Sequence, residues 1–155
     1  MRLLTEILNE SCVVLDLAVS SKDTVIESLV DSLVRAEVVQ DRQRMVDDLK
    51  KRERVMSTGI GSGIAVPHAQ SPGASRLAMS LGRLAQPIDF EALDERPVRL
   101  VFMVVGPEER GGFIRVLARI SRLLYSGDLQ RNLLRARTSA EAIACIREEE
   151  AKITG

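Results

Sequence analysis

The chain has 155 residues, 45% of them hydrophobic and only 3% aromatic, and its 22 basic side chains balance 22 acidic ones. This length suits one domain over residues 1–155, with a core built from aliphatic side chains. Zero formal net charge gives no general attraction to nucleic acid or to an anionic membrane surface. No apolar run approaches the length of a membrane span, and the first residues lack the apolar core of a secretory signal. We therefore expect a cytoplasmic protein that binds no nucleic acid and does not insert into a membrane.

The two cysteines lie far apart in the sequence, each among apolar residues. Cys12 precedes a β-like run, and Cys145 stands between Ala144 and Ile146. Such surroundings favour small core thiols, and a disulfide or a metal site is the less favoured interpretation.

Periodic patterns predict a strand and two helices in the amino-terminal part. After a short helical face at 3–8, we expect a strand at 12–17, a helix at 23–36 and a more charged helix from 40 to about 51. Thr24 and Glu27 have the spacing of a capping box, in which a hydroxyl and a carboxylate satisfy free amides at a helix start. The second helix brings Arg52 towards the glycine-rich segment that follows.

That segment leads to the one histidine of the chain. Residues 57–68 run Ser-Thr-Gly-Ile-Gly-Ser-Gly-Ile-Ala-Val-Pro-His. The glycines allow tight turns and can bring amide N–H groups close to an anion. We expect a short buried strand at 64–66, ended by Pro67, which holds His68 at a rigid exit from a sheet. A histidine beside amides and hydroxyls suggests a nucleophile that takes a phosphoryl group and passes it on.

The remaining residues predict two more strands and three more helices. Residues 77–84 alternate as a strand, and the run 98–105 is apolar enough for a central strand covered on both faces. Helices are expected at 113–124, about 129–135 and about 139–149. The fold class is therefore α/β, a sandwich with a mixed β-sheet flanked by helices on both faces.

Two local features of these helices follow from their side chains. Thr138 and Glu141 have the spacing of a cap for the last helix. Arg115, Arg119 and Arg122 would form the solvated face of the helix at 113–124, with Phe113 on its core side.

The residues alone leave other interpretations of the glycine-rich segment open. His68 could be a structural histidine at a strand end, and Ser57 and Thr58 could simply cap a turn. Arg52 could be an ordinary cation at a helix end. Zinc is disfavoured because there is no second histidine and no cysteine nearby in the sequence. A nucleotide-binding loop is disfavoured because its glycines follow a strand, whereas these precede one.

Three stretches, 52–53, 57–61 and 63–69, carry a resemblance to a known family. They resemble the enzyme IIA component of the bacterial sugar phosphotransferase system, in its fructose/mannitol-type branch, which includes the nitrogen-regulatory IIA proteins. The similarity extends over essentially the whole chain, which is thus identified as one IIA type-2 domain. The resemblance implies the family's α/β architecture.

The resemblance also implies the site and its partners. His68 would be phosphorylated by a small histidine-phosphocarrier protein, with Arg52 beside it and the hydroxyls of Ser57 and Thr58 on the phosphate side. No metal or cofactor is implied. The phosphoryl group would pass to a IIB component, or act as a switch on a regulatory target protein. The nitrogen-regulatory type is favoured over a sugar-transport subunit because the chain shows no fused IIB or IIC segment.

One position departs from the family's pattern. The family usually has a second histidine at the start of the helix after the central strand, where this chain has Phe113. Phenylalanine offers no hydrogen-bond donor, and a guanidinium from Arg110 or Arg115 could supply part of the missing donors. The alternative is a protein-binding regulatory module in which phosphotransfer is weak or lost.

Overall fold

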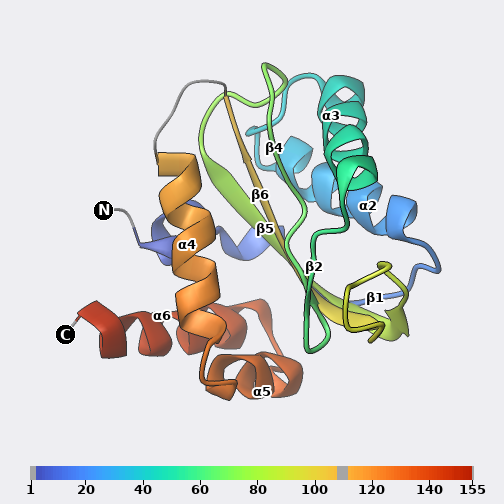
Figure 1. The fold of residues 1–155 in the computed structure, drawn as a ribbon. Coiled ribbons are helices and arrows are strands. Elements are labelled where there is room, and N and C mark those ends of the chain that lie inside the picture. Colours follow the sequence, from blue (N-terminus) through green and yellow to red (C-terminus); the bar gives the residue numbers. More distant parts are fainter. Residues whose placement is uncertain (1–2, 108–111, 155) are drawn as a thin grey trace.

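The computed structural model describes residues 3–107 and 112–154 (Figure 1). In chain order the elements are α1 (Leu4–Ile7), a 3₁₀ turn (Glu10–Cys12), β1 (Val13–Leu17), α2 (Lys22–Arg35), α3 (Arg42–Val55), β2 (Gly59–Gly61), β3 (Ile64–Ala65), β4 (His68–Gln70), β5 (Ala78–Ile88), β6 (Val98–Gly106), α4 (Gly112–Leu124), α5 (Asp128–Arg135) and α6 (Ser139–Thr154).

The strands form one mixed sheet in the order β1-β5-β6-β3-β2, with β4 also paired to β6. β1 runs parallel to β5, β5 antiparallel to β6, and both β3 and β4 parallel to β6. β6 has partners on both sides, and all of its residues except the half-buried Arg99 are buried. The predicted central strand and the predicted α/β sandwich with a mixed sheet are both confirmed.

Side chains along β5 show that helices cover both faces of the sheet. Ser80 points towards α2, where its hydroxyl lies 2.9 Å from the hydroxyl of Ser32. Arg83 points to the opposite face, and its guanidinium donates to the carbonyls of Leu133 and Ala136 at the end of α5, at 3.0 and 2.6 Å. In Figure 1, α2 and α3 lie to the right of the sheet and α4 lies to its left. The core between these layers is almost entirely aliphatic, as its composition predicts.

Pro67 does not end the strand in the way the sequence suggested. Ile64 pairs with Leu100 and His68 with Val104, so the register along β6 is the same before and after the proline. Proline lacks an N–H but keeps its carbonyl, and the Pro67 carbonyl accepts from the Val104 amide at 3.0 Å. The prediction that Pro67 stops the ladder is therefore wrong, and His68 is the first residue of β4.

Two helix starts were predicted, one correctly. Thr138 caps α6, since its hydroxyl accepts from the Glu141 amide at 3.1 Å. The capping box of α2, however, is formed by Ser21 and Thr24 and not by Thr24 and Glu27. The carboxylate of Glu27 instead accepts from the ammonium group of a lysine in α3 at 3.1 Å.

Arg115, Arg119 and Arg122 on α4 do not form a uniformly solvated face. Arg115 and Arg122 are exposed, but Arg119 is buried and its Nε donates to Glu150 of α6 at 2.8 Å. Glu150 is also buried and accepts from the amide of Leu4 at 2.7 Å. This ion pair thus ties α4, α6 and the start of α1 together, which corrects the prediction for Arg119.

The two cysteines and the apolar character of the helices complete the description of the fold. Cys12 is a buried free thiol and Cys145 a half-buried one. Within the described ranges, none of the helices combines the length and apolar character that a bilayer span requires.

Candidate functional site

His68 is held by the sheet through its backbone and by one hydrogen bond through its ring. The Nδ1 atom lies 2.8 Å from the carbonyl oxygen of Val66. A carbonyl can only accept, so Nδ1 carries the proton and Nε2 is left with a free lone pair. The backbone two residues before His68 therefore selects Nε2 as the nucleophilic atom.

The surroundings keep this imidazole neutral. Burial lowers the pKa of His68 below its usual value of 6.5, and the positive charge of Arg52 lowers it further. The hydrogen bond to Val66 and the negative charge of Glu53 act in the opposite direction. Because the lowering effects prevail, the neutral form with its lone pair predominates at pH 7.

A groove of about 480 Å³ opens beside His68, between the end of α3 and the start of α4. Arg52 lines one wall and Phe113 the other. The phenyl ring of Phe113 is tilted by 52° to the imidazole, with 5.9 Å between the ring centroids. Phe113 is therefore both a buried residue, as predicted, and a direct neighbour of His68. Of the two arginines suggested to compensate for it, Arg115 is exposed on α4 and Arg110 lies outside the described residues.

Arg52 comes from the last turn of α3, which runs four residues further than predicted, to Val55. Its Nη1 donates to the carbonyl oxygen of Met56 at 2.9 Å, where it satisfies a free carbonyl at the helix end. A guanidinium has five N–H donors, so this bond leaves others for an anion in the groove. The helix end thus places a cation beside the nucleophile.

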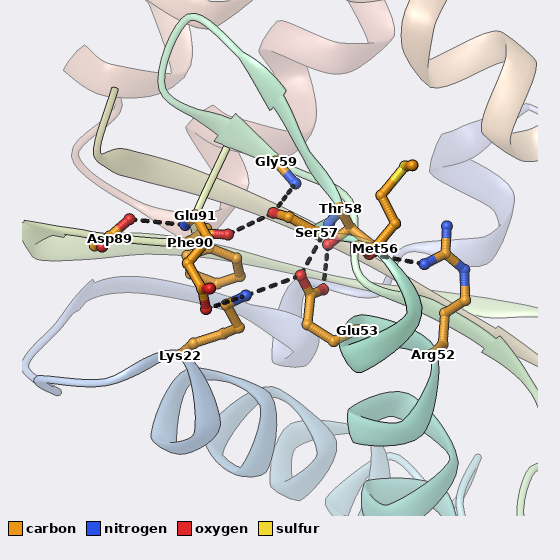
Figure 2. Close-up of polar contacts among 10 residues, drawn as sticks. All are labelled: Lys22, Arg52, Glu53, Met56, Ser57, Thr58, Gly59, Asp89, Phe90 and Glu91. Carbon is orange, nitrogen blue, oxygen red and sulfur yellow. Dashed lines mark hydrogen bonds and ion pairs between the residues drawn. The ribbon is translucent and has the colours of Figure 1, made fainter. Parts of the chain in front are cut away.

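Ser57 and Thr58 point elsewhere in the structure (Figure 2). The Ser57 hydroxyl donates to the carbonyl oxygen of Phe90. The Thr58 hydroxyl and amide both donate to Glu53, at 2.5 and 2.9 Å. Neither residue lines the groove beside His68, so their predicted contact with phosphate requires a change of partners and stays a prediction.

The glycine-rich turn also lies away from this groove. β2 and β3 form a hairpin whose turn has positive φ at Gly61, Ser62 and Gly63. The Ser62 amide donates to the carboxylate of Asp94 at 2.9 Å, and the Ser62 carbonyl accepts from the side chain of Gln130 in α5. These glycines therefore shape a hairpin tip, and the groove that His68 lines has no wall from them.

Comparison with known proteins identifies the family. The model of the phosphoenolpyruvate-dependent sugar phosphotransferase system EIIA 2 family matches residues 6–149. The chain belongs to this family. Proteins of this family take part in phosphoryl transfer within that system.

Relatives in the family include both sugar-specific and regulatory proteins. The chain is 35% identical over 142 residues to a nitrogen regulatory protein of Bradyrhizobium diazoefficiens, which covers 90% of this chain and 91% of the relative. It is 33% identical over 148 residues to the fructose-specific EIIABC component of Bacillus subtilis, covering 95% of this chain but only 23% of that relative's length. The crystal structure of the nitrogen regulatory protein IIA-Ntr from Neisseria meningitidis superposes with a TM-score of 0.85 at 30% identity, covering 92% of this chain and 97% of that one.

One residue of the site was missed by sequence reasoning as a functional candidate. Glu53 was noted only as part of the matching text, yet its carboxylate is buried and accepts three hydrogen bonds. Its partners Thr58 and Lys22 lie five residues after it and 31 residues before it. No sequence pattern joins positions at these separations, so only the fold could reveal the cluster.

Proposed function

We propose that the chain is a phosphocarrier whose His68 accepts a phosphoryl group from the phosphorylated histidine of a small phosphocarrier protein. The observation that carries the proposal is the hydrogen bond from Nδ1 to the Val66 carbonyl, which leaves Nε2 as the nucleophile. The Nε2 lone pair attacks phosphorus, and the donor's N–P bond breaks with its electron pair returning to the donor imidazole. His68 keeps its Nδ1 proton throughout, so no separate base is needed.

Arg52 supplies the main electrostatic contribution in this proposal. The transferred phosphoryl group carries its charge on three oxygens, and catalysis of such a step is mostly positioning and charge stabilisation. A guanidinium already fixed at a groove wall provides donors without reorganisation at the moment of reaction. The groove's other wall, from Phe113 and Ile114, is apolar and supplies no polar group to the transfer.

The regulatory type of IIA protein is the version of this function that we favour. The match to nitrogen regulatory proteins spans nine-tenths or more of both chains in sequence and in structure. The chain would then receive the phosphoryl group and use it as a charge switch on a target protein. Transfer to a IIB component, as in a sugar-transport subunit, is the alternative.

A second candidate function rests on the ring contact between Phe113 and His68. An apolar ring beside the nucleophile gives no hydrogen bond to a phosphoryl group, so transfer could be slow and the protein could act mainly by docking. The two functions require the same fold and differ in the rate of phosphoryl transfer.

The test uses the chain, the phosphorylated carrier protein and intact mass measurement. We expect a mass increase of one phosphoryl group that is lost in acid, and no increase in the His68→Ala variant. Because His68 is the sole histidine, acid-labile phosphate on the variant would refute the proposed acceptor. Absence of any transfer to the parent chain would favour the docking function. A phosphorylated chain that passes its group to a IIB protein would favour the transport type.

A further inference from the structure

Glu53 is a buried carboxylate at the end of α3, one residue after Arg52. Only 6% of the residue is exposed. Its Oε1 accepts from the Thr58 hydroxyl at 2.5 Å, and its Oε2 accepts from the Thr58 amide at 2.9 Å and from Lys22 Nζ at 3.2 Å (Figure 2). A buried charge is retained only when it is paired and hydrogen-bonded, and Glu53 meets both conditions.

Hydrogen bonds continue from Glu53 to the nucleophile. The Thr58 carbonyl accepts from the Val66 amide at 2.9 Å, in the hairpin that brings β2 beside β3. The Val66 carbonyl then accepts from His68 Nδ1 at 2.8 Å. Glu53 therefore holds the backbone of Thr58 in place, Thr58 holds the backbone of Val66, and Val66 holds the imidazole.

We infer that Glu53 is a positioning residue for phosphoryl transfer, which holds the Val66 carbonyl where it selects the Nδ1–H tautomer of His68. The inference rests on the proposed function of His68. Arg52 and Glu53 divide two tasks at one helix end: Arg52 lines the groove for the incoming phosphoryl group, and Glu53 turns inward to support the nucleophile. Adjacent helical residues lie about 100° apart around the axis, which is why neighbours can serve opposite sides.

Lys22 holds Glu53 in place from the start of α2. Its ammonium group also lies 3.4 Å from Glu91 and 5.5 Å from the ring centroid of Phe90. The Lys22 side chain is 17% exposed, whereas that of Glu91 is 78% exposed. Glu91 contacts the same cation as Glu53, and among the described residues it makes no hydrogen bond or ion pair with Thr58 or the hairpin, which makes it a matched control.

The decisive measurement is the tautomer of His68, because the sole histidine gives a single imidazole signal. With ¹⁵N-labelled histidine, two-bond ¹H–¹⁵N spectra distinguish the Nδ1–H from the Nε2–H form in the unphosphorylated chain. We expect the Nδ1–H form to predominate in the parent. In Glu53→Gln an amide NH₂ replaces one accepting oxygen and faces donors from Thr58 or Lys22. The ratio of Nδ1–H to Nε2–H should fall roughly two- to tenfold, which corresponds to the loss of one hydrogen bond.

Phosphoryl transfer from the carrier is measured on the same samples. Misplacing the nucleophile should slow transfer about 10- to 100-fold in Glu53→Gln. Glu91→Gln should leave both the tautomer ratio and the transfer rate at parent values. If Glu53→Gln does not fold, Thr58→Val and Thr58→Ser decide, since only valine removes the hydroxyl: valine should shift the tautomer ratio and serine should not.

Unchanged tautomer ratios in Glu53→Gln, or in Thr58→Val where it replaces that variant, would overturn the inference. Slower transfer in Thr58→Val with an unchanged tautomer ratio would also overturn it, and would assign Thr58 to the phosphate instead. The tautomer measurement needs no phosphoryl transfer. A parent chain that is never phosphorylated would therefore refute the proposed function separately.

Discussion

Replacing Phe113 by histidine tests whether the apolar groove wall limits phosphoryl transfer. The ring centroids of Phe113 and His68 are 5.9 Å apart, so an imidazole at position 113 would face a phosphoryl group on His68 from across the groove. A hydrogen bond to a charged group is worth about 1.5–3 kcal/mol. If it forms with the transferring oxygens, transfer should accelerate roughly 10- to 100-fold, or the lifetime of phosphohistidine should lengthen by the same factor.

The same change has a cost in stability. Phe113 is 5% exposed, and a smaller, polar ring in its place loses apolar contacts and buries an N–H group. We expect a loss of about 2 kcal/mol in the free energy of unfolding, and a fall of roughly 4–8 °C in Tm for a chain of this size. Phe113→Leu is the matched control, because it removes the ring and adds no donor.

The assay follows acid-labile label from phosphorylated carrier on the parent, Phe113→His and Phe113→Leu. Thermal melting is followed in parallel. The leucine variant should lose stability and keep the parent's rate, whereas the histidine variant should lose stability and gain rate or lifetime. Equal kinetics in all three proteins would refute the reasoning and leave Phe113 as a core residue only.

Three further predictions follow from the site and the core. Arg52→Ala should slow phosphoryl transfer about 10- to 1,000-fold, which is the effect of losing one preorganised donor. It should lower Tm by only about 1–3 °C, because the single hydrogen bond to Met56 is near the surface. A large Tm loss with normal transfer would contradict this prediction. NMR titration of His68 should give a pKa below 6.5. Below its usual pKa of 6.5 the histidine of the unfolded chain binds a proton that the folded chain resists, so neutral His68 should stabilise the fold less as the pH falls through and below 6.5. Between pH 7.5 and 5.5, the free energy of unfolding in urea should therefore fall less for His68→Gln than for the parent. Arg119→Met should destabilise the fold by about 3–5 kcal/mol in urea unfolding because it removes the cation of a buried ion pair with Glu150. A loss under about 1 kcal/mol would show that this pair is dispensable.

The sequence predicted the layers of the fold better than the contacts between them. The run 98–105 is apolar at nearly every position, and it is the buried centre of the sheet. The periodicity of α4 correctly placed Phe113 on the buried side. It could not show that Arg119 meets Glu150, because a helical period gives a direction and not the element that covers it.

The placement of the candidate site residues could be predicted only in part, and their roles in phosphoryl transfer stay predictions. His68 follows from its motif, and the structure brings Arg52 and Phe113 to the same groove. The glycine turn was predicted beside an anion, but its amide at Ser62 bonds to the distant Asp94, a partner that no local pattern reveals. The continued ladder after Pro67 was also missed, since the rule that proline interrupts a strand concerns its nitrogen and leaves its carbonyl available.

The constant register of β3 and β4 along β6 has a consequence for which changes in length this protein can accept. Ile64 and His68 keep the same offset to their partners Leu100 and Val104, so the intervening residues act as a spacer of fixed length. Inserting or deleting one residue there would turn the imidazole to the opposite face of the sheet, away from Phe113 of α4. The hairpin tip before it lies at the sheet's edge and can lengthen without moving His68. Natural variation in chain length should therefore collect before Ile64 and be absent between Ile64 and His68.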